Sequence, residues 1–278
     1  MPFCTCQDIT LYYEVHGEGF PLLLVAGLSG GTWSWYGQVP YFQKHYKTIV
    51  FDNRGAGRSD MPPGPYNMKQ LAKDALCLLD RLEVEEAFVM ALSMGGMIAQ
   101  ELALLAPQRI RALVLGCTHS GGRDRVPPAP FAVEILLDHR GLTQEQILEK
   151  NLPIFFSEEC LKNRPEVTLA YCTAQVTAPL QPEHAFQAQL AAISTFDCSE
   201  RLSEIRIPTL VLTGTRDVLI PSANAFYLAR HLPDAELVEL PGAGHALHAE
   251  CRDWLNILAD HFFQRRGDNC ASVKILKP

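Results

Sequence analysis

Three residues that lie far apart in the chain are of the types that nucleophilic catalysis requires: Ser93, Asp217 and His245. A serine hydroxyl is a weak nucleophile at neutral pH, so it needs a base within hydrogen-bonding distance. Imidazole, with a pKa of about 6.5, suits that role. A buried carboxylate on the far side of the imidazole fixes its tautomer and stabilises its protonated form. If the fold brings these side chains together, the chemistry they predict is hydrolysis through a covalent acyl-enzyme.

The serine lies between an apolar run at 87–92 and a stretch of helix formers at 97–104. This pattern predicts a buried strand, a very short turn and a helix. Small residues at Ala91 and Gly95 let the strand and the helix approach each other closely. The helix would then aim its N-terminal N–H groups at anything bonded to Ser93. Taken alone, the stretch also fits a serine that caps an ordinary buried helix.

The acid and the histidine also follow predicted strands. Asp217 comes after the apolar run at 209–213, and His245 follows the run at 235–240. In an open α/β sheet, ligands bind outside the carboxyl ends of the strands. The pattern therefore places all three side chains at one edge of a sheet.

Each assignment has an alternative. Asp217 could be an acidic turn residue, and Asp124, which follows the preceding strand, is the reserve candidate for the acid. His248 competes with His245 for the role of base, although we expect it to pack beneath the site.

The motifs around these residues resemble the α/β-hydrolase family. Its nucleophile turn, G-x-S-x-G, is present with Ala91 in place of the first glycine, and the order serine, acid, histidine is the one associated with this fold. The Gly-rich loop 27–31, which otherwise reads as a plain strand-to-helix connection, then implies half of an oxyanion hole. We expect the backbone N–H groups of Leu28 and Met94 to be its two donors. Loss of one such donor typically costs about 2.7–4 kcal/mol of barrier.

The fold class predicted is α/β, with a doubly wound, mostly parallel sheet and an inserted helical lid. Strands alternate with helices through residue 120, which is typical of a parallel sheet. Residues 121–199 contain helical patterns without a clear strand, and the strand pattern resumes after them. We therefore divide the chain into a core segment 1–120, a lid 121–199 and a second core segment 200–278. A separate helical domain is the alternative for the middle segment.

The resemblance implies a branch that contains carboxylesterases, 3-oxoadipate enol-lactonases, cofactor-free haloperoxidases and C–C bond hydrolases. A serine nucleophile disfavours epoxide hydrolases and haloalkane dehalogenases, whose turn carries aspartate. We predict a hydrolase of small to medium uncharged carboxylic esters, with an apolar pocket formed by Trp33, Trp35 and Phe131, together with Met94. Two hypotheses remain beside it: an enol-lactone or vinylogous diketone hydrolase, and a slow-hydrolysing ligand receptor. An anionic lactone would require a cation, for which the sequence offers Arg123, Arg125 and Arg140.

Composition limits the partners. The chain of 278 residues has 47% hydrophobic and 20% charged residues, which fits one large globular domain. A net charge of −7 disfavours nucleic acid, and the absence of a long apolar run or a leader pattern disfavours a membrane span and secretion. The nine cysteines form no framework, so we expect them to be reduced and the protein cytoplasmic. Cys4 and Cys6 have no second pair at zinc spacing, so we expect no metal. We also expect no cofactor, a small-molecule ester as partner and a possible homodimer.

Overall fold

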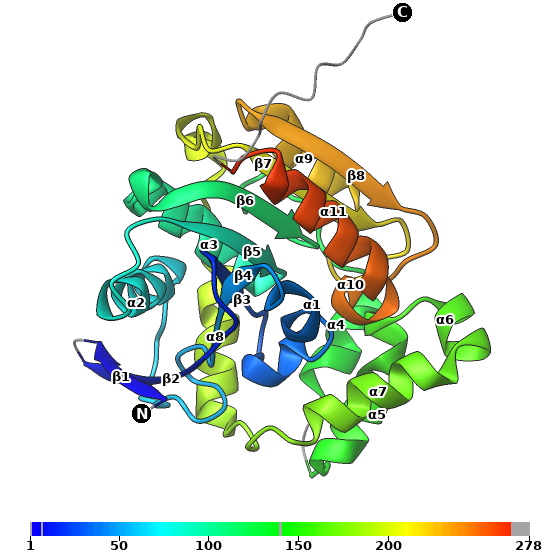
Figure 1. The fold of residues 1–278 in the computed structure, drawn as a ribbon. Helices are drawn as coiled ribbons and strands as arrows, with labels where there is room; N and C mark the ends of the chain where they lie inside the picture. Colours follow the sequence, from blue (N-terminus) through cyan, green and yellow to red (C-terminus); the bar gives the residue numbers. More distant parts are fainter. Residues whose placement is uncertain (1, 7, 139–140, 268–278) are drawn as a thin grey trace, which may run out of the picture.

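The computed structural model describes residues 2–6, 8–138 and 141–267. In this part of the chain, eight strands form one sheet in the order β1-β2-β4-β3-β5-β6-β7-β8 (Figure 1). Strand β2 pairs antiparallel with both β1 and β4, and all the other neighbouring strands are parallel. The mostly parallel α/β sheet predicted from the sequence is confirmed, with β1 as an additional strand. The strand bounds are β1 Phe3–Cys6, β2 Ile9–His16, β3 Phe20–Val25, β4 Tyr46–Phe51, β5 Ala87–Leu92, β6 Ile110–Gly116, β7 Thr209–Gly214 and β8 Ala235–Leu240.

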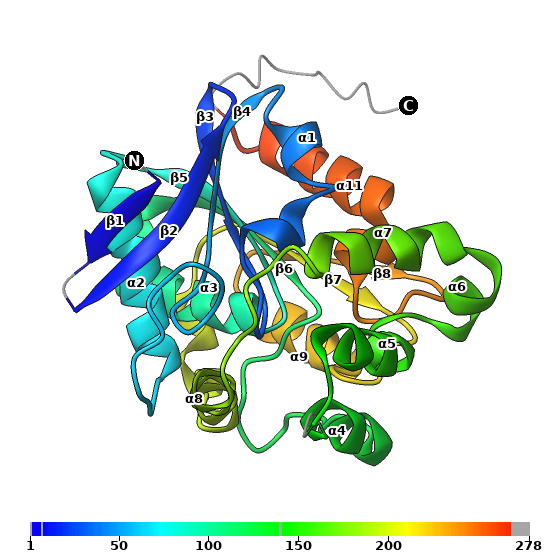
Figure 2. The same ribbon diagram turned by 90° about the horizontal axis from the view of Figure 1, so that it is seen from below.

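The two middle strands, β3 and β5, are apolar at every position because helices cover both faces of the sheet. Along β3, Leu23 belongs to the hydrophobic cluster on one face, whereas Leu24 belongs to the cluster on the other. Val89 and Met90 of β5 divide in the same way. Figures 1 and 2 show the covering helices on opposite sides. These are α2 Met68–Arg81, α3 Met94–Leu105 and α9 Ala223–His231 on one face, and α1 Val39–Phe42 and α11 Arg252–Gln264 on the other.

Among the described residues of the segment predicted as a lid, five α-helices lie between β6 and β7. They are α4 Pro130–Leu137, α5 Gln144–Phe155, α6 Glu158–Asn163, α7 Pro165–Gln175 and α8 Glu183–Ser194. Figure 2 shows α5, α6 and α7 grouped together and apart from α8. Helix α8 packs into the core beside the sheet through Ala188 and Ala192, whereas Phe156 and Tyr171 belong to a small separate cluster near α10 Leu247–Glu250. The division of the chain into core and lid stays a prediction.

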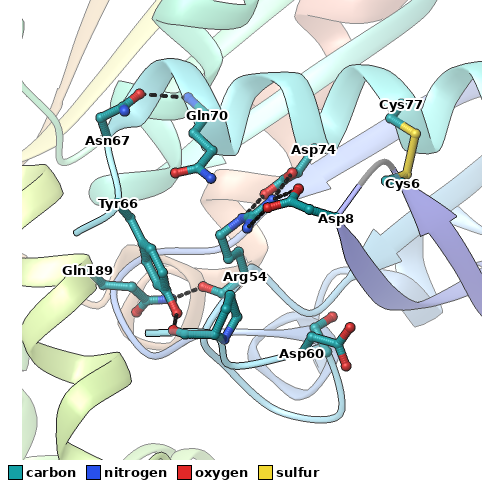
Figure 3. A network of polar contacts seen from close by, with 12 residues as sticks. Cys6, Asp8, Arg54, Asp60, Tyr66, Asn67, Gln70, Asp74, Cys77 and Gln189 are labelled. Atoms are coloured by element: carbon teal, nitrogen blue, oxygen red, sulfur yellow. Dashed lines mark hydrogen bonds and ion pairs between the residues drawn. A yellow bond between two sulfur atoms is a disulfide. The ribbon is translucent and has the colours of Figure 1, made fainter. Parts of the chain in front are cut away.

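The loop that follows β4 is held by charged and amide side chains. The buried guanidinium of Arg54 forms ion pairs with Asp74 of α2 at 2.7 Å and with Asp8 at 3.0 Å (Figure 3). Its backbone carbonyl accepts a hydrogen bond from the amide Nε2 of Gln189 at 2.7 Å. Because Gln189 belongs to α8, this loop connects a helix of the predicted lid to the sheet.

One cysteine pair contradicts the expectation that all nine are reduced. Cys6 at the end of β1 and Cys77 of α2 form a disulfide (Figure 3). Their separation of 71 residues leaves no local spacing pattern, and only the placement of β1 beside α2 brings them together. The predicted cytoplasmic location therefore loses the support it took from these cysteines and stays a prediction. No helix in the described part of the chain is long and apolar enough to cross a membrane.

Candidate active site

Ser93 sits in a strained turn between β5 and α3. Its φ of 55° and ψ of −124° are unusual for a residue with a side chain. Its N–H donates to the Gly116 carbonyl at 2.9 Å, and its carbonyl accepts from the Thr118 hydroxyl at 2.8 Å. Gly95 is required for this packing, because a Cβ there would lie 2.1 Å from the Val25 carbonyl oxygen. The surrounding structure thus holds the serine in a conformation it would not adopt alone.

The three side chains singled out in the sequence form one hydrogen-bonded chain. His245 Nε2 lies 3.0 Å from Ser93 Oγ, and His245 Nδ1 lies 2.7 Å from Asp217 Oδ2. The other carboxylate oxygen, Oδ1, accepts from the N–H groups of Leu219 at 2.9 Å and Ile220 at 2.8 Å. The Asp217 side chain is fully buried, so these bonds fix its orientation. With the carboxylate accepting, Nδ1 carries the proton and Nε2 is free to accept from the serine.

The two competing candidates, His248 and Asp124, are not part of this hydrogen-bonded chain. His248 packs between the rings of Trp35 and Tyr171, with centroid separations of 6.3 and 6.0 Å. Burial, and secondarily the charge of His245, lowers the pKa of His248 to about 4, so its ring is neutral at pH 7. Asp124 is exposed and lies near Arg123 at 3.7 Å. Among the described residues, neither forms a hydrogen bond with Ser93, whose side chain is instead bonded to His245 and through it to Asp217.

The Gly-rich loop after β3 lies directly against the serine, because a Cβ on Gly27 would be 3.2 Å from the Ser93 Cβ. Within the described residues, the N–H groups of Leu28 and Met94 donate to no acceptor. The next N–H, that of Ser29, donates to Gln189 Oε1 at 2.9 Å. The loop therefore has one N–H anchored by α8 and its neighbour available for a ligand, as an oxyanion hole requires.

A cavity of about 640 Å³ opens above the serine and the histidine. Trp35 lines it, as predicted. Trp33 does not, because residues two positions apart in the 3₁₀ turn Thr32–Trp35 point in different directions, and its indole N–H donates to Gln175 Oε1 at 3.0 Å. The prediction is also wrong for Phe131 and Met94, which do not line the cavity. Phe131 is 49% exposed, and Met94 is fully buried in the core. The apolar lining comes instead from residues such as Met97, Val133, Leu136, Leu148, Leu190 and Ile220.

Cys117, which directly follows β6, was not singled out in the sequence. Its thiol, the Asp217 carboxylate and the His245 imidazole lie within 4.8 Å of one another. Burial and the charge of Asp217 raise the pKa of the Cys117 thiol well above its usual value. The thiol therefore remains protonated and serves as a weak donor beside the carboxylate rather than as a thiolate ligand. Its position after a strand, at the edge where Asp217 lies, was the available signal.

Comparison with known proteins agrees with this geometry. Residues 21–250 match the family described as alpha/beta hydrolase fold. The chain belongs to the α/β-hydrolase family. Among curated members it is 32% identical, over 92% of its length and 96% of the relative's, to a protein of Azorhizobium caulinodans named "Putative carbamate hydrolase RutD". It is 30% identical to 3-oxoadipate enol-lactonase 2 of Acinetobacter baylyi, over 88% and 90% of the two chains.

Solved structures of the α/β-hydrolase family superpose over nearly the whole molecule. The enol-lactonase of Burkholderia xenovorans LB400 matches with a TM-score of 0.83 and 26% identity, covering 95% of this chain and 100% of its own. The relatives' names specify different bonds, a carbamate in one case and an enol-lactone in the other two. Family membership therefore establishes a hydrolase and leaves the substrate to be argued from the site.

Proposed function

We propose that this hydrolase cleaves small to medium carboxylic esters through an acyl-enzyme formed on Ser93. The observation that carries the proposal is the hydrogen-bonded chain from Asp217 through His245 to Ser93, which opens into the cavity. The cavity volume lies within the range of about 300–1,000 Å³ found for small-molecule sites. The expected partner is accordingly a small ester, and a homodimer stays a prediction.

The mechanism follows from the positions of the atoms. Ser93 Oγ attacks the substrate carbonyl while His245 Nε2 takes the hydroxyl proton, and Asp217 stabilises the imidazolium through Nδ1–H. The N–H groups of Leu28 and Met94 receive the oxyanion of the tetrahedral intermediate. The imidazolium then returns its proton to the departing alkoxide, which leaves as the alcohol. Water, activated by the same imidazole, hydrolyses the acyl-enzyme and releases the acid.

A second candidate function is opening of an enol-lactone. The similarity to two proteins named enol-lactonase supports it, and the ring ester would be attacked by the same serine. A slow receptor, the candidate of a different class, has the weaker support, because Ser93 and both of its partners are placed for turnover.

Ser93→Ala tests the proposal. The variant should fold normally, because alanine retains the backbone bonds to Gly116 and Thr118, and it should lose at least about 1,000-fold in the turnover of p-nitrophenyl esters. Burst kinetics of the wild type separate an enzyme from a receptor. Repeated turnover supports the hydrolase, whereas release of a single equivalent of p-nitrophenol supports the receptor. Full activity of Ser93→Ala would rule out the mechanism.

A further inference from the structure

Two polar side chains from the segment after β6 line the same cavity as Ser93 and His245. They are His119 and Arg125, and Nη1 of Arg125 lies 3.4 Å from Nε2 of His119. His119 is buried and Arg125 half-buried. Neither residue takes part in the ester chemistry described above. Their close approach in the cavity lining therefore requires another explanation.

The proton on His119 can be located from its neighbours. The backbone N–H of Gly121 donates to Nδ1 at 3.0 Å, so Nδ1 carries no proton. Burial, and secondarily the charge of Arg125, lowers the pKa of His119 to about 3, so the ring is neutral and its one proton is on Nε2. A guanidinium is always a donor. The His119 Nε2–H and the Arg125 N–H groups therefore face each other as donors, and they lack an acceptor between them.

The charge of Arg125 is also uncompensated. Among the described residues, no carboxylate lies within ion-pair distance of it, and the described lining of the cavity contains no Asp, Glu or Lys. The arginines considered from the sequence thus differ: the side chain of Arg123 is 94% exposed, and Arg140 lies outside the described residues. A cation in a mostly apolar cavity attracts an anion more strongly than it would in water.

We propose that Arg125 and His119 bind a carboxylate of the substrate, so that the preferred substrates are esters or lactones that carry a free carboxylate. This inference rests on the proposed function and replaces the sequence-based expectation of uncharged esters. The carboxylate would accept one hydrogen bond from the Arg125 guanidinium and another from His119 Nε2–H. It would thereby supply the acceptor that these two donors lack. The apolar lining would hold the carbon chain between the carboxylate and the scissile carbonyl.

The test uses pairs of esters that differ only in charge. Mono-p-nitrophenyl glutarate is compared with its methyl ester, which places the carboxylate on the acyl side. In the second pair, 4-acetoxybenzoate is compared with its methyl ester, so that the carboxylate is on the leaving group. For at least one of the two pairs, we expect wild-type kcat/KM to be at least about tenfold higher for the free acid than for the methyl ester, the effect typical of a charge-assisted hydrogen bond. Equal values within both pairs would overturn the proposal.

The variants assign that preference to the residues. Arg125→Met should remove it, mainly by raising the KM of the free acid. Arg125→Lys should retain part of it, and His119→Phe should weaken it. Arg123→Met, which removes the same charge from an exposed side chain, is the matched control and should have no effect. Equal preference in Arg125→Met and wild type, with both folded by circular dichroism, would contradict the assignment.

Failure of the proposed function can be told apart from failure of this inference. Hydrolysis of the neutral esters by wild type tests the ester chemistry alone. If neither ester of any pair is hydrolysed, calorimetric titration with monomethyl glutarate decides the carboxylate site. Binding that Arg125→Met abolishes and Arg123→Met preserves supports the site, whereas equal binding or no binding to all three proteins overturns it.

Discussion

Replacement of Asp217 by asparagine tests how the carboxylate controls the imidazole. In the wild type, Oδ1 accepts from two backbone N–H groups, those of Leu219 and Ile220, and Oδ2 accepts from His245. Asparagine has one acceptor oxygen and one NH₂ donor. Because the two backbone N–H groups require an acceptor, the amide oxygen should remain with them, and the NH₂ group should face His245.

The consequence is the wrong tautomer. With an NH₂ donor opposite Nδ1, the ring should move its proton to Nε2, where it can no longer accept the hydroxyl proton of Ser93. The known cost of this exchange in a serine triad is about 10⁴ in kcat, which corresponds to about 5.4 kcal/mol of barrier. Substrate contacts are unchanged, so KM should move little.

Steady-state hydrolysis of a p-nitrophenyl ester at pH 7–8 measures this effect, with the melting temperature as a check of folding. Asp124→Asn is the matched control, since it makes the same chemical change in the exposed reserve candidate, and it should retain full activity. The reasoning would be refuted by an Asp217→Asn variant that keeps kcat within about tenfold of the wild type. Loss of activity in Asp124→Asn alone would assign the acid to the other residue.

Three further predictions concern packing and pH. Gly95→Ala should destabilise the protein by at least about 1–3 kcal/mol in chemical denaturation, because its Cβ would overlap the Val25 carbonyl, whereas Gly267→Ala should be close to neutral. Trp35→Phe should change KM for bulky esters, and Trp33→Phe, outside the cavity, should leave KM within about twofold. Burial holds His248 neutral when folded, with a pKa of about 4, whereas the unfolded chain gains this proton below about pH 6.5. The free energy of unfolding should therefore fall as pH drops from about 6.5 to about 4, and a His248→Phe variant with an unchanged pH profile would contradict this.

Much of the fold was predictable because its signals are local. The middle strands are continuous apolar runs, and the buried residues Leu71, Ala75 and Leu78 of α2 recur at helical spacing. The turn at Ser93 could be recognised because close strand-to-helix packing needs very small residues, and Gly95 leaves no room for a side chain. Because parallel strands end at one edge of a sheet, their order in the sequence is enough to group Ser93, Asp217 and His245.

The features missed from the sequence depend on tertiary contacts. Cys6 and Cys77 are paired because an antiparallel strand lies beside α2, which no spacing rule encodes. Trp33 and Trp35 look equivalent in the sequence, because a 3₁₀ turn of four residues is too short for its three-residue period to be recognised there. The inward placement of Arg125 likewise follows from the path of an irregular segment after β6, where neither helical nor strand periodicity applies.

Gln189 limits how freely this enzyme can be re-engineered. Its side-chain amide, on α8, forms hydrogen bonds with two loops of the core. Oε1 accepts from the N–H of Ser29 in the loop after β3, and Nε2 donates to the carbonyl of Arg54 in the loop after β4. Exchanging residues 121–199 for the corresponding segment of a relative would alter selectivity and also remove these two hydrogen bonds. In such a chimera, the loop that carries Leu28 would be misplaced unless the new segment contained an equivalent glutamine. Substrate specificity and reaction rate therefore cannot be changed independently by exchanging this segment.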